Sequence, residues 1–224
     1  MELYKFAIQH DWAVLLPIAV CSMLALGVTI ERTWYYLYNK RVLGDVGEFI
    51  YELEQELDKG IESARAFASR KGGVVGQVAE EGARIAAQHP DRFETMFDVA
   101  SSLATRKLDQ NLSILGTIAT ISPYLGLFGT VVRILYTFGE LARTTGNSTP
   151  DIMFGIGSAL IATAFGLGVA IFAVTVNNYF HTAVDRFVND FDLIKLVYLG
   201  ALGVVPKSAD RRKGRFATTD EIRI

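Results

Sequence analysis

The sequence predicts an all-α membrane protein with three transmembrane helices and long helical extensions into the cytoplasm. The first observation behind this prediction is that three long stretches contain no Asp, Glu, Lys or Arg. Each is long enough for a helix, at about 1.5 Å per residue, to cross a hydrocarbon layer of roughly 30 Å. The second is that the charged residues, 21% of the chain, concentrate between these stretches. The uncharged stretches run from Trp12 to Ile30, from Gln110 to Val132 and from Ile152 to Phe180.

The distribution of basic residues predicts the orientation. All 22 Lys and Arg residues except Lys5, Arg133 and Arg143 lie between residues 32 and 107 or from residue 186 onward. Cytoplasmic segments carry the excess of Lys and Arg, so both regions are expected in the cytoplasm. The expected segments are a periplasmic N-terminus (1–11), transmembrane helix 1 (12–37), a cytoplasmic helical region (38–110), transmembrane helix 2 (111–140), a periplasmic link (141–151), transmembrane helix 3 (152–180), and a cytoplasmic helix and basic tail (181–224).

A cleaved signal peptide is the competing interpretation of the first uncharged stretch. Only Lys5 precedes that stretch, against Glu2 and Asp11, and no small-x-small cleavage pattern follows it. Aromatic residues at 34–36 close it instead, as they do at a membrane interface. This pattern favours a retained span.

Composition and motifs argue against several other classes of protein. The formal net charge of −2 gives no reason to expect a nucleic-acid partner, and the single Cys21 provides no disulfide framework or cysteine metal site. The three histidines are scattered without ligand spacing, and no nucleophile lies near a base in a recognisable motif. We therefore expect neither an enzyme nor a resident metal or cofactor.

Between the first and second spans the sequence predicts amphipathic helices. Apolar residues recur at steps of three and four from Val46 to Ile61, and the predicted helix ends at Gly72-Gly73. A second helix is expected over about 75–88. Because no Gly or Pro occurs between Asp91 and Gly116, a third helix is expected to run from Asp91 into the second span without interruption.

Polar residues line one side of the second span. Thr130, Arg133 and Thr137 fall within about 60° of one another on a helix, with Ser122 at the margin of this stripe. An Arg at the centre of a span costs on the order of 2.5–3.5 kcal/mol on insertion scales. Arg133 therefore either faces water or a partner's carboxylate, or snorkels along the lipid surface. The Thr130 hydroxyl either bonds to its own helix or lines a pore.

The third span is rich in small residues and carries Thr163 near its middle, where the level of Thr130 is expected. Small residues mark close helix contact in membranes, either within one subunit or between subunits. Those singled out here are Gly126 and Gly129 in the second span and Gly155, Ala159, Ala162 and Gly166 in the third. No Asp or Glu lies at 110–139 or 152–184, so a partner would have to supply any carboxylate that carries protons.

Motifs in all three spans resemble the MotA/TolQ/ExbB family. The stretch from Ser122 to Val131, SPYLGLFGTV, resembles the motif of its second span, and the stretch from Gly155 to Leu167 resembles that of its third. Ser22 with Glu31-Arg32 resembles the end of its first span. Three spans with a large cytoplasmic insert fit the ExbB and TolQ branches, because the flagellar MotA branch has an additional span.

This resemblance implies an inner-membrane stator subunit that couples proton or sodium flow to work on the envelope. The implied partners are further copies in a homopentamer, an ExbD- or TolR-like single-span dimer carrying an Asp, and a TonB- or TolA-like energy transducer. Membrane lipids are also expected partners, and the basic tail at 211–213 either stays in solvent or contacts anionic headgroups. By position, Thr130 and Thr163 match the pore-lining threonines of the family, which face that Asp.

The chain also departs from the family pattern at two positions. The family typically has Glu where this chain has Ser158, and a small residue where it has Arg133. A hydroxyl at 158 suits sodium, whereas Arg133 could compensate by pairing with the partner. Arg133, Ser158 and Thr137 are therefore candidates for pore or partner contact. The rival hypothesis is a non-conducting scaffold that holds partner proteins, and a solute transporter is disfavoured because three spans offer no inverted repeat.

Overall fold

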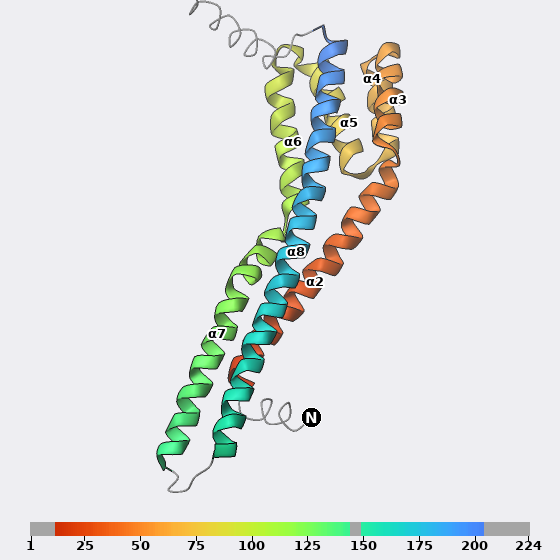
Figure 1. Cartoon of the computed structure of the whole chain (residues 1–224). Helices are drawn as coiled ribbons and strands as arrows, with labels where there is room; N and C mark the ends of the chain where they lie inside the picture. The colour runs from red at the N-terminus through yellow and green to blue at the C-terminus, as the bar shows by residue number, and fades with distance from the viewer. Residues whose placement is uncertain (1–11, 144–148, 204–224) are drawn as a thin grey trace, which may run out of the picture. The chain divides into compact units, whose positions relative to one another are not determined.

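The described parts of the chain, residues 12–143 and 149–203, are helical and contain no strand in this computed structural model (Figure 1). Three of the helices are long and apolar enough to cross a membrane, over residues 15–43, 112–139 and 152–201. The predicted all-α class with three membrane helices is therefore confirmed. The helices are α2 (Trp12–Leu43), α3 (Val46–Lys59), α4 (Ile61–Lys71), α5 (Gly73–Gln88), η1 (Pro90–Arg92), α6 (Phe93–Asp109), α7 (Leu112–Arg143) and α8 (Thr149–Ala201).

The N-terminal segment 1–11, part of the link between α7 and α8 and the basic tail from residue 204 lie outside the described residues. The remaining chain divides into two compact units. The apolar unit comprises the described residues of 1–33 and 110–181, and the polar unit comprises 34–109 and the described residues of 182–224. Each unit is described separately below.

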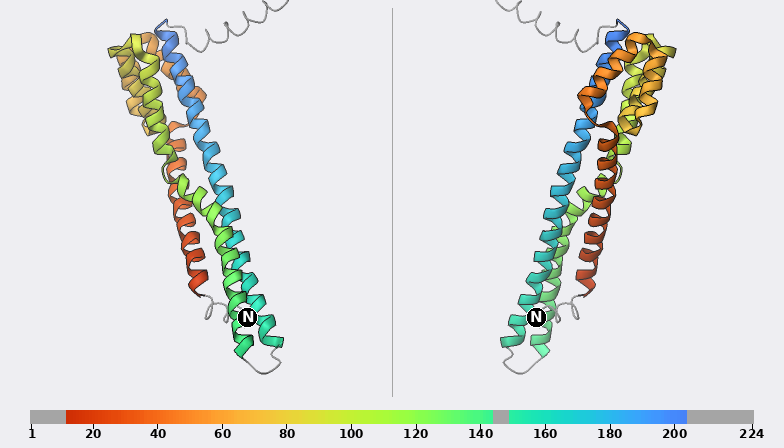
Figure 2. Two further views of the ribbon diagram at one scale, coloured as in Figure 1. Left: turned by 90° about the vertical axis from the view of Figure 1, so that its left-hand side faces the viewer. Right: turned by 90° about the vertical axis from the view of Figure 1, so that its right-hand side faces the viewer.

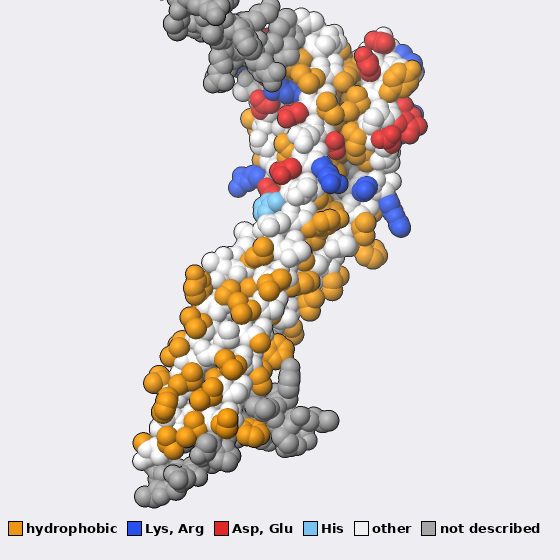
Figure 3. Space-filling view, in the orientation of Figure 1, with side chains coloured by type: hydrophobic (Ala, Val, Ile, Leu, Met, Phe, Trp, Pro, Cys, Tyr) orange, Lys and Arg blue, Asp and Glu red, His pale blue; other side chains and the backbone are white. Residues whose placement is uncertain are grey.

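In the apolar unit, α7 runs alongside the first half of α8 (Figure 2). The two backbones approach closely because glycines face each other: a Cβ on Gly166 would lie 2.6 Å from the Ser122 carbonyl oxygen and 2.9 Å from the Gly126 Cα. Large hydrophobic side chains cover the visible outer surface (Figure 3). Leu127, Leu135 and Ile171, for example, are exposed. A surface of this kind suits hydrocarbon surroundings.

The polar unit buries aromatic side chains between its helices. Phe49 of α3 stacks on Phe67 of α4, with ring centroids 5.5 Å apart. Near the end of α8, Tyr198 packs on Phe93 and donates a hydrogen bond of 2.7 Å to the carbonyl of Ala79 in α5. These contacts join α8 to the helices between the first two spans.

Two predicted continuous helices are interrupted. The first amphipathic helix divides at Gly60, whose φ of 134° favours glycine. The prediction that the third helix runs unbroken from Asp91 into the second span is wrong, because α6 ends at Asp109 and α7 begins at Leu112. Asn111 occupies the break with φ 64°, a left-handed conformation that Asn tolerates better than most residues.

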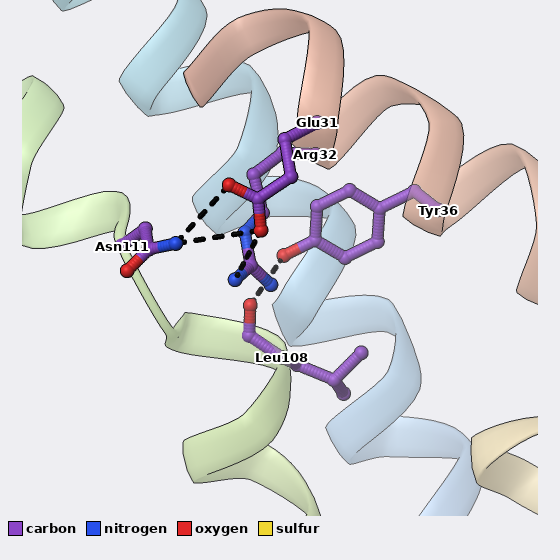
Figure 4. A network of polar contacts seen from close by, with 5 residues as sticks. All are labelled: Glu31, Arg32, Tyr36, Leu108 and Asn111. Carbon is purple, nitrogen blue, oxygen red and sulfur yellow. Dashed lines mark hydrogen bonds and ion pairs between the residues drawn. The ribbon is translucent and has the colours of Figure 1, made fainter. Parts of the chain in front are cut away.

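Polar contacts accompany the break in both units (Figure 4). In the apolar unit, the Asn111 Nδ2 atom donates to Glu31 Oε2 at 3.1 Å, and Glu31 also pairs with the buried Arg32. In the polar unit, the Tyr36 hydroxyl donates to the Leu108 carbonyl oxygen at 2.8 Å. The latter bond satisfies one of the carbonyls that the end of α6 leaves without a helical partner.

Candidate functional site

A group of polar side chains lies between α7 and α8 in the apolar unit. We call it the polar seam: Thr130, Arg133 and Thr137 of α7 with Ser158 and Thr163 of α8. Four of the five are buried, and Thr163 is half-buried. The three α7 residues share one face because they are spaced by three and four positions. Because lipid offers no hydrogen bonds, polar atoms at this depth need partners within the protein or in a wet cavity.

Arg133 points from α7 toward α8 and is only 5% exposed. Its Nε atom donates a hydrogen bond of 3.1 Å to the Ser158 Oγ atom. Its guanidinium also lies over the Tyr136 ring, 5.5 Å from the centroid. This arrangement does not fit snorkelling along the lipid surface. It joins Arg133 to Ser158, two of the residues named above as candidates for pore or partner contact.

The two threonines form different hydrogen bonds. Thr130 Oγ1 donates to the Leu127 carbonyl oxygen in its own helix at 2.6 Å. Thr163 Oγ1 donates across to the Gly126 carbonyl oxygen on α7 at 3.0 Å. Since Gly126 lies about one turn before Thr130, the two hydroxyls lie within about one turn of each other.

The small residues of both helices bring α7 and α8 close enough for these bonds to form. A Cβ on Gly126 would lie 3.0 Å from the Thr163 Cα, and a Cβ on Gly155 would collide with the Thr137 side chain. The Thr137 hydroxyl in turn donates to the Arg133 carbonyl oxygen at 2.9 Å. All six small residues named in the sequence analysis are buried: Gly126, Gly129, Gly155, Ala159, Ala162 and Gly166.

Sequence reasoning places Ser122 only at the margin of the seam, yet it is fully buried. Within the described residues, its Oγ atom has no hydrogen-bond partner. Its spacing of four positions from Gly126 is the signal that places it on the α8-facing side. The contact between Glu31 and Asn111 had no such signal, because it depends on how α2 and α7 are aligned.

No described set of three or more His, Cys, Asp or Glu side chains could hold a metal ion. The hydroxyl oxygens of the seam can accept a hydrogen bond or bind a cation, whereas the guanidinium can only donate, for example to a carboxylate. Among the described side chains of α7 and of α8 up to residue 181, Arg133 alone carries a permanent charge.

Comparison with known proteins identifies relatives across most of the chain. The family model described as the MotA/TolQ/ExbB proton channel family matches residues 59–193. The chain is 40% identical over 93 residues to the Tol-Pal system protein TolQ of Pseudomonas aeruginosa, a match that covers 42% of this chain and 40% of that protein. It is 32% identical over 143 residues to the biopolymer transport protein ExbB of Aquifex aeolicus, which covers 64% of this chain and 92% of that protein.

A third relative is the ExbB-like 1 protein of Synechocystis, 29% identical over 170 residues and 73% of this chain. The chain spans 65% of the length of that protein and 40% of the Pseudomonas TolQ, less than two thirds of either. The family match nevertheless includes all of α4 to α7 and most of α8, and thus the whole polar seam.

Proposed function

The chain belongs to the MotA/TolQ/ExbB proton channel family, and from this premise we propose that it is the ring-forming subunit of an ion-driven motor in the bacterial inner membrane. In this proposal, a homopentamer surrounds a dimer of an ExbD- or TolR-like single-span protein. An Asp in the partner's span takes up and releases protons or sodium ions. A TonB- or TolA-like transducer then delivers the work to the envelope. The N-terminus is periplasmic and the C-terminus cytoplasmic.

The observation that carries this proposal is the buried polar seam between α7 and the first half of α8, two stretches in which most of the other side chains are apolar. A helix that served only as an anchor would gain nothing from an Arg and several hydroxyls at membrane depth, where such groups are costly and usually functional. Residues 110–139 and 152–184 contain no carboxylate. An ion route based on a titrating carboxylate therefore needs a partner that supplies it.

Within this proposal, Thr130 and Thr163 line the ion route, and Arg133, Ser158 and Thr137 form the adjoining contact with the partner. Their hydroxyl oxygens lie within a short section of the α7–α8 interface, which supports a shared role. The energy available is sufficient for conformational work, because one charge crossing 100 mV releases about 2.3 kcal/mol. A few ions per step would therefore shift a conformational equilibrium decisively.

The test is to purify the tagged chain from its native membrane and weigh the intact complex by native mass spectrometry. We expect a homopentamer that retains two copies of a single-span protein with an Asp in its span. A ring that holds no such protein would contradict the motor and favour the non-conducting scaffold. A water-soluble chain would contradict both proposals.

A further inference from the structure

The outer side of α7 carries a row of large apolar side chains that points away from the polar seam. We call this row the α7 stripe, and its members are spaced by four and three positions, so they share one face of the helix. At about 100° per residue, Tyr124 lies about 180° around α7 from Arg133. The stripe consists of Tyr124, Phe128, Val131, Leu135 and Phe138, and each of them is between 49% and 67% exposed.

A groove of about 450 Å³ lies between α2 and α8 in the same unit. Ser22 and Leu26 line it from α2, and Ala164 and Gly168 line it from α8. Ala164 lies two positions from Gly166, which packs against α7, so Ala164 is on the far side of α8. A Cβ on Gly168 would meet nothing within 4 Å. Since a cavity of about 150 Å³ can hold benzene, the groove has room for two aromatic rings and for a methyl group at Gly168.

The stripe and the groove lie at the same depth in the membrane. Gly126 fixes the level of α7 against α8, because a Cβ there would lie 3.0 Å from the Thr163 Cα and 3.3 Å from the Gly166 Cα. Since the two helices run in opposite directions and rise about 1.5 Å per residue, Phe128 lies within about 3 Å of the level of Ala164. Identical chains that span one membrane in one orientation form a ring about an axis along the membrane normal, so this match in depth also holds between copies.

We propose that the α7 stripe of one copy occupies the groove between α2 and α8 of the next copy in the ring, with the Phe128 ring over Ala164 of that copy. This inference rests on the proposed function, in which the chain forms a homopentamer, and it names the surfaces that join the subunits. The contact is heterologous, because two different surfaces of the chain meet in it. Repeated about one axis, a heterologous contact closes into a ring.

The area and the chemistry of the two surfaces suit a contact between copies. Aromatic side chains bury about 150–250 Å² each, so at these exposures the five side chains of the stripe present roughly 500 Å². Counting the walls of the groove as well, each contact buries roughly 1,000 Å², the size that a specific interface needs. Neither the stripe nor the lining of the groove includes a charged side chain, so no charged group is desolvated when they meet.

Lipid chains can cover either surface separately, but they do not account for a row of large side chains and a groove lined by small residues at the same depth. Between helices in lipid, association depends on close van der Waals packing and on small residues that allow it. Ala164 and Gly168 allow close approach, and Phe128 and Tyr124 are the side chains that fill the groove.

The test is disulfide cross-linking in native membranes with copper phenanthroline as the oxidant, in a Cys21→Ser background that removes the single native cysteine. The variant carries both Phe128→Cys and Ala164→Cys. Because these positions lie on opposite outer sides of the α7–α8 pair, a bond between them has to join two copies. We expect a ladder of covalent multimers up to the pentamer on non-reducing gels, and each cysteine alone should give monomer only.

The matched control pairs Leu135→Cys with Ala164→Cys. Leu135 belongs to the same stripe and is as exposed as Phe128, at 67% against 61%. It lies about 10 Å further along α7, too far from the level of Ala164 for a disulfide, which needs Cα atoms within about 7 Å of each other. The control should therefore give no ladder.

A second variant, Ala164→Phe, places a ring where the Phe128 ring of the neighbouring copy should lie. It should lower the ratio of pentamer to monomer in native mass spectrometry by about tenfold or more. Gly27→Phe adds a ring at an exposed position of α2 outside the groove lining, where a Cβ also meets nothing within 4 Å. This variant should assemble as the original protein does. If Phe128→Cys itself prevents assembly, the comparison of Ala164→Phe with Gly27→Phe decides the matter alone.

Three outcomes would overturn the inference and leave the proposed function standing. The first is a pentamer that forms no cross-link between positions 128 and 164 and tolerates Ala164→Phe. The second is covalent dimers from Phe128→Cys alone, which would place two stripes against each other. The third is a co-purified phospholipid that Ala164→Phe displaces without loss of the pentamer, which would identify lipid as the occupant of the groove. By contrast, an unsubstituted chain that stays monomeric would overturn the proposed function itself.

Discussion

Replacing Gly166 by Ala tests the close approach of α7 and α8. The added Cβ would lie 2.6 Å from the Ser122 carbonyl oxygen and 2.9 Å from the Gly126 Cα. Both of these are backbone atoms, so no side chain can rotate away, and the helices must separate by several tenths of an ångström. Overpacking of this kind costs about 1–3 kcal/mol. For a chain of this size, each kcal/mol lowers the melting temperature by roughly 2–4 °C.

The assay is thermal unfolding of the purified protein in detergent, followed by circular dichroism. Gly168→Ala is the matched control, because it lies two positions further along α8 and a Cβ there meets nothing within 4 Å. We expect Gly166→Ala to melt several degrees below the original protein and Gly168→Ala to melt at or slightly above it, since Ala favours helix more than Gly. Equal melting temperatures for the two variants would refute the predicted glycine contact.

Three further predictions concern individual polar contacts. Ser158→Ala should lower the free energy of unfolding by about 1.5–3 kcal/mol in the original protein, because it removes a hydrogen bond to a charged group. The same substitution should have little effect in an Arg133→Met background. A double-mutant cycle of unfolding free energies that shows no coupling between the two positions would contradict the bond. Tyr198→Phe removes a buried hydrogen bond to α5 and should lower the free energy of unfolding by about 0.5–1.5 kcal/mol in denaturant titrations, whereas an unchanged value would remove that bond. Hydrogen bonding by Lys59 lowers the pKa of Glu56, so this carboxylate stabilises the fold above its ordinary pKa range and loses that contribution as pH falls through the lowered pKa. An NMR titration should show the Glu56 pKa returning upward in Lys59→Met, and no change would refute the assigned cause.

Sequence reasoning recovered the membrane helices because their signal is local. An uncharged stretch long enough to span a bilayer needs no knowledge of the rest of the fold. The break between α6 and α7 was missed because it depends on Asn111. Asn tolerates a left-handed conformation, but its presence does not predict a helix end as that of Gly or Pro does. The division at Gly60 was missed for a different reason: a glycine is present there, but the apolar spacing continues across it.

The composition of the polar seam was predictable, but its pairing was not. Helical spacing alone placed Thr130, Arg133 and Thr137 on one face of the second span. The bond from Arg133 to Ser158 depends on the alignment of α7 against α8, which the contact between Gly126 and Gly166 sets. No rule based on one helix contains that alignment, so the sequence alone does not determine where the guanidinium points.

The most direct measurement of the central claim is proton flux into liposomes that contain the complete complex under an imposed membrane potential. The original protein and Thr175→Val, a control on α8 whose exposed hydroxyl bonds to its own helix, should conduct protons at similar rates. Thr163→Val, assembled to the same extent, should conduct many times more slowly because it lacks the acceptor oxygen beside Gly126. Equal flux in all three would contradict a role for the polar seam in the ion route.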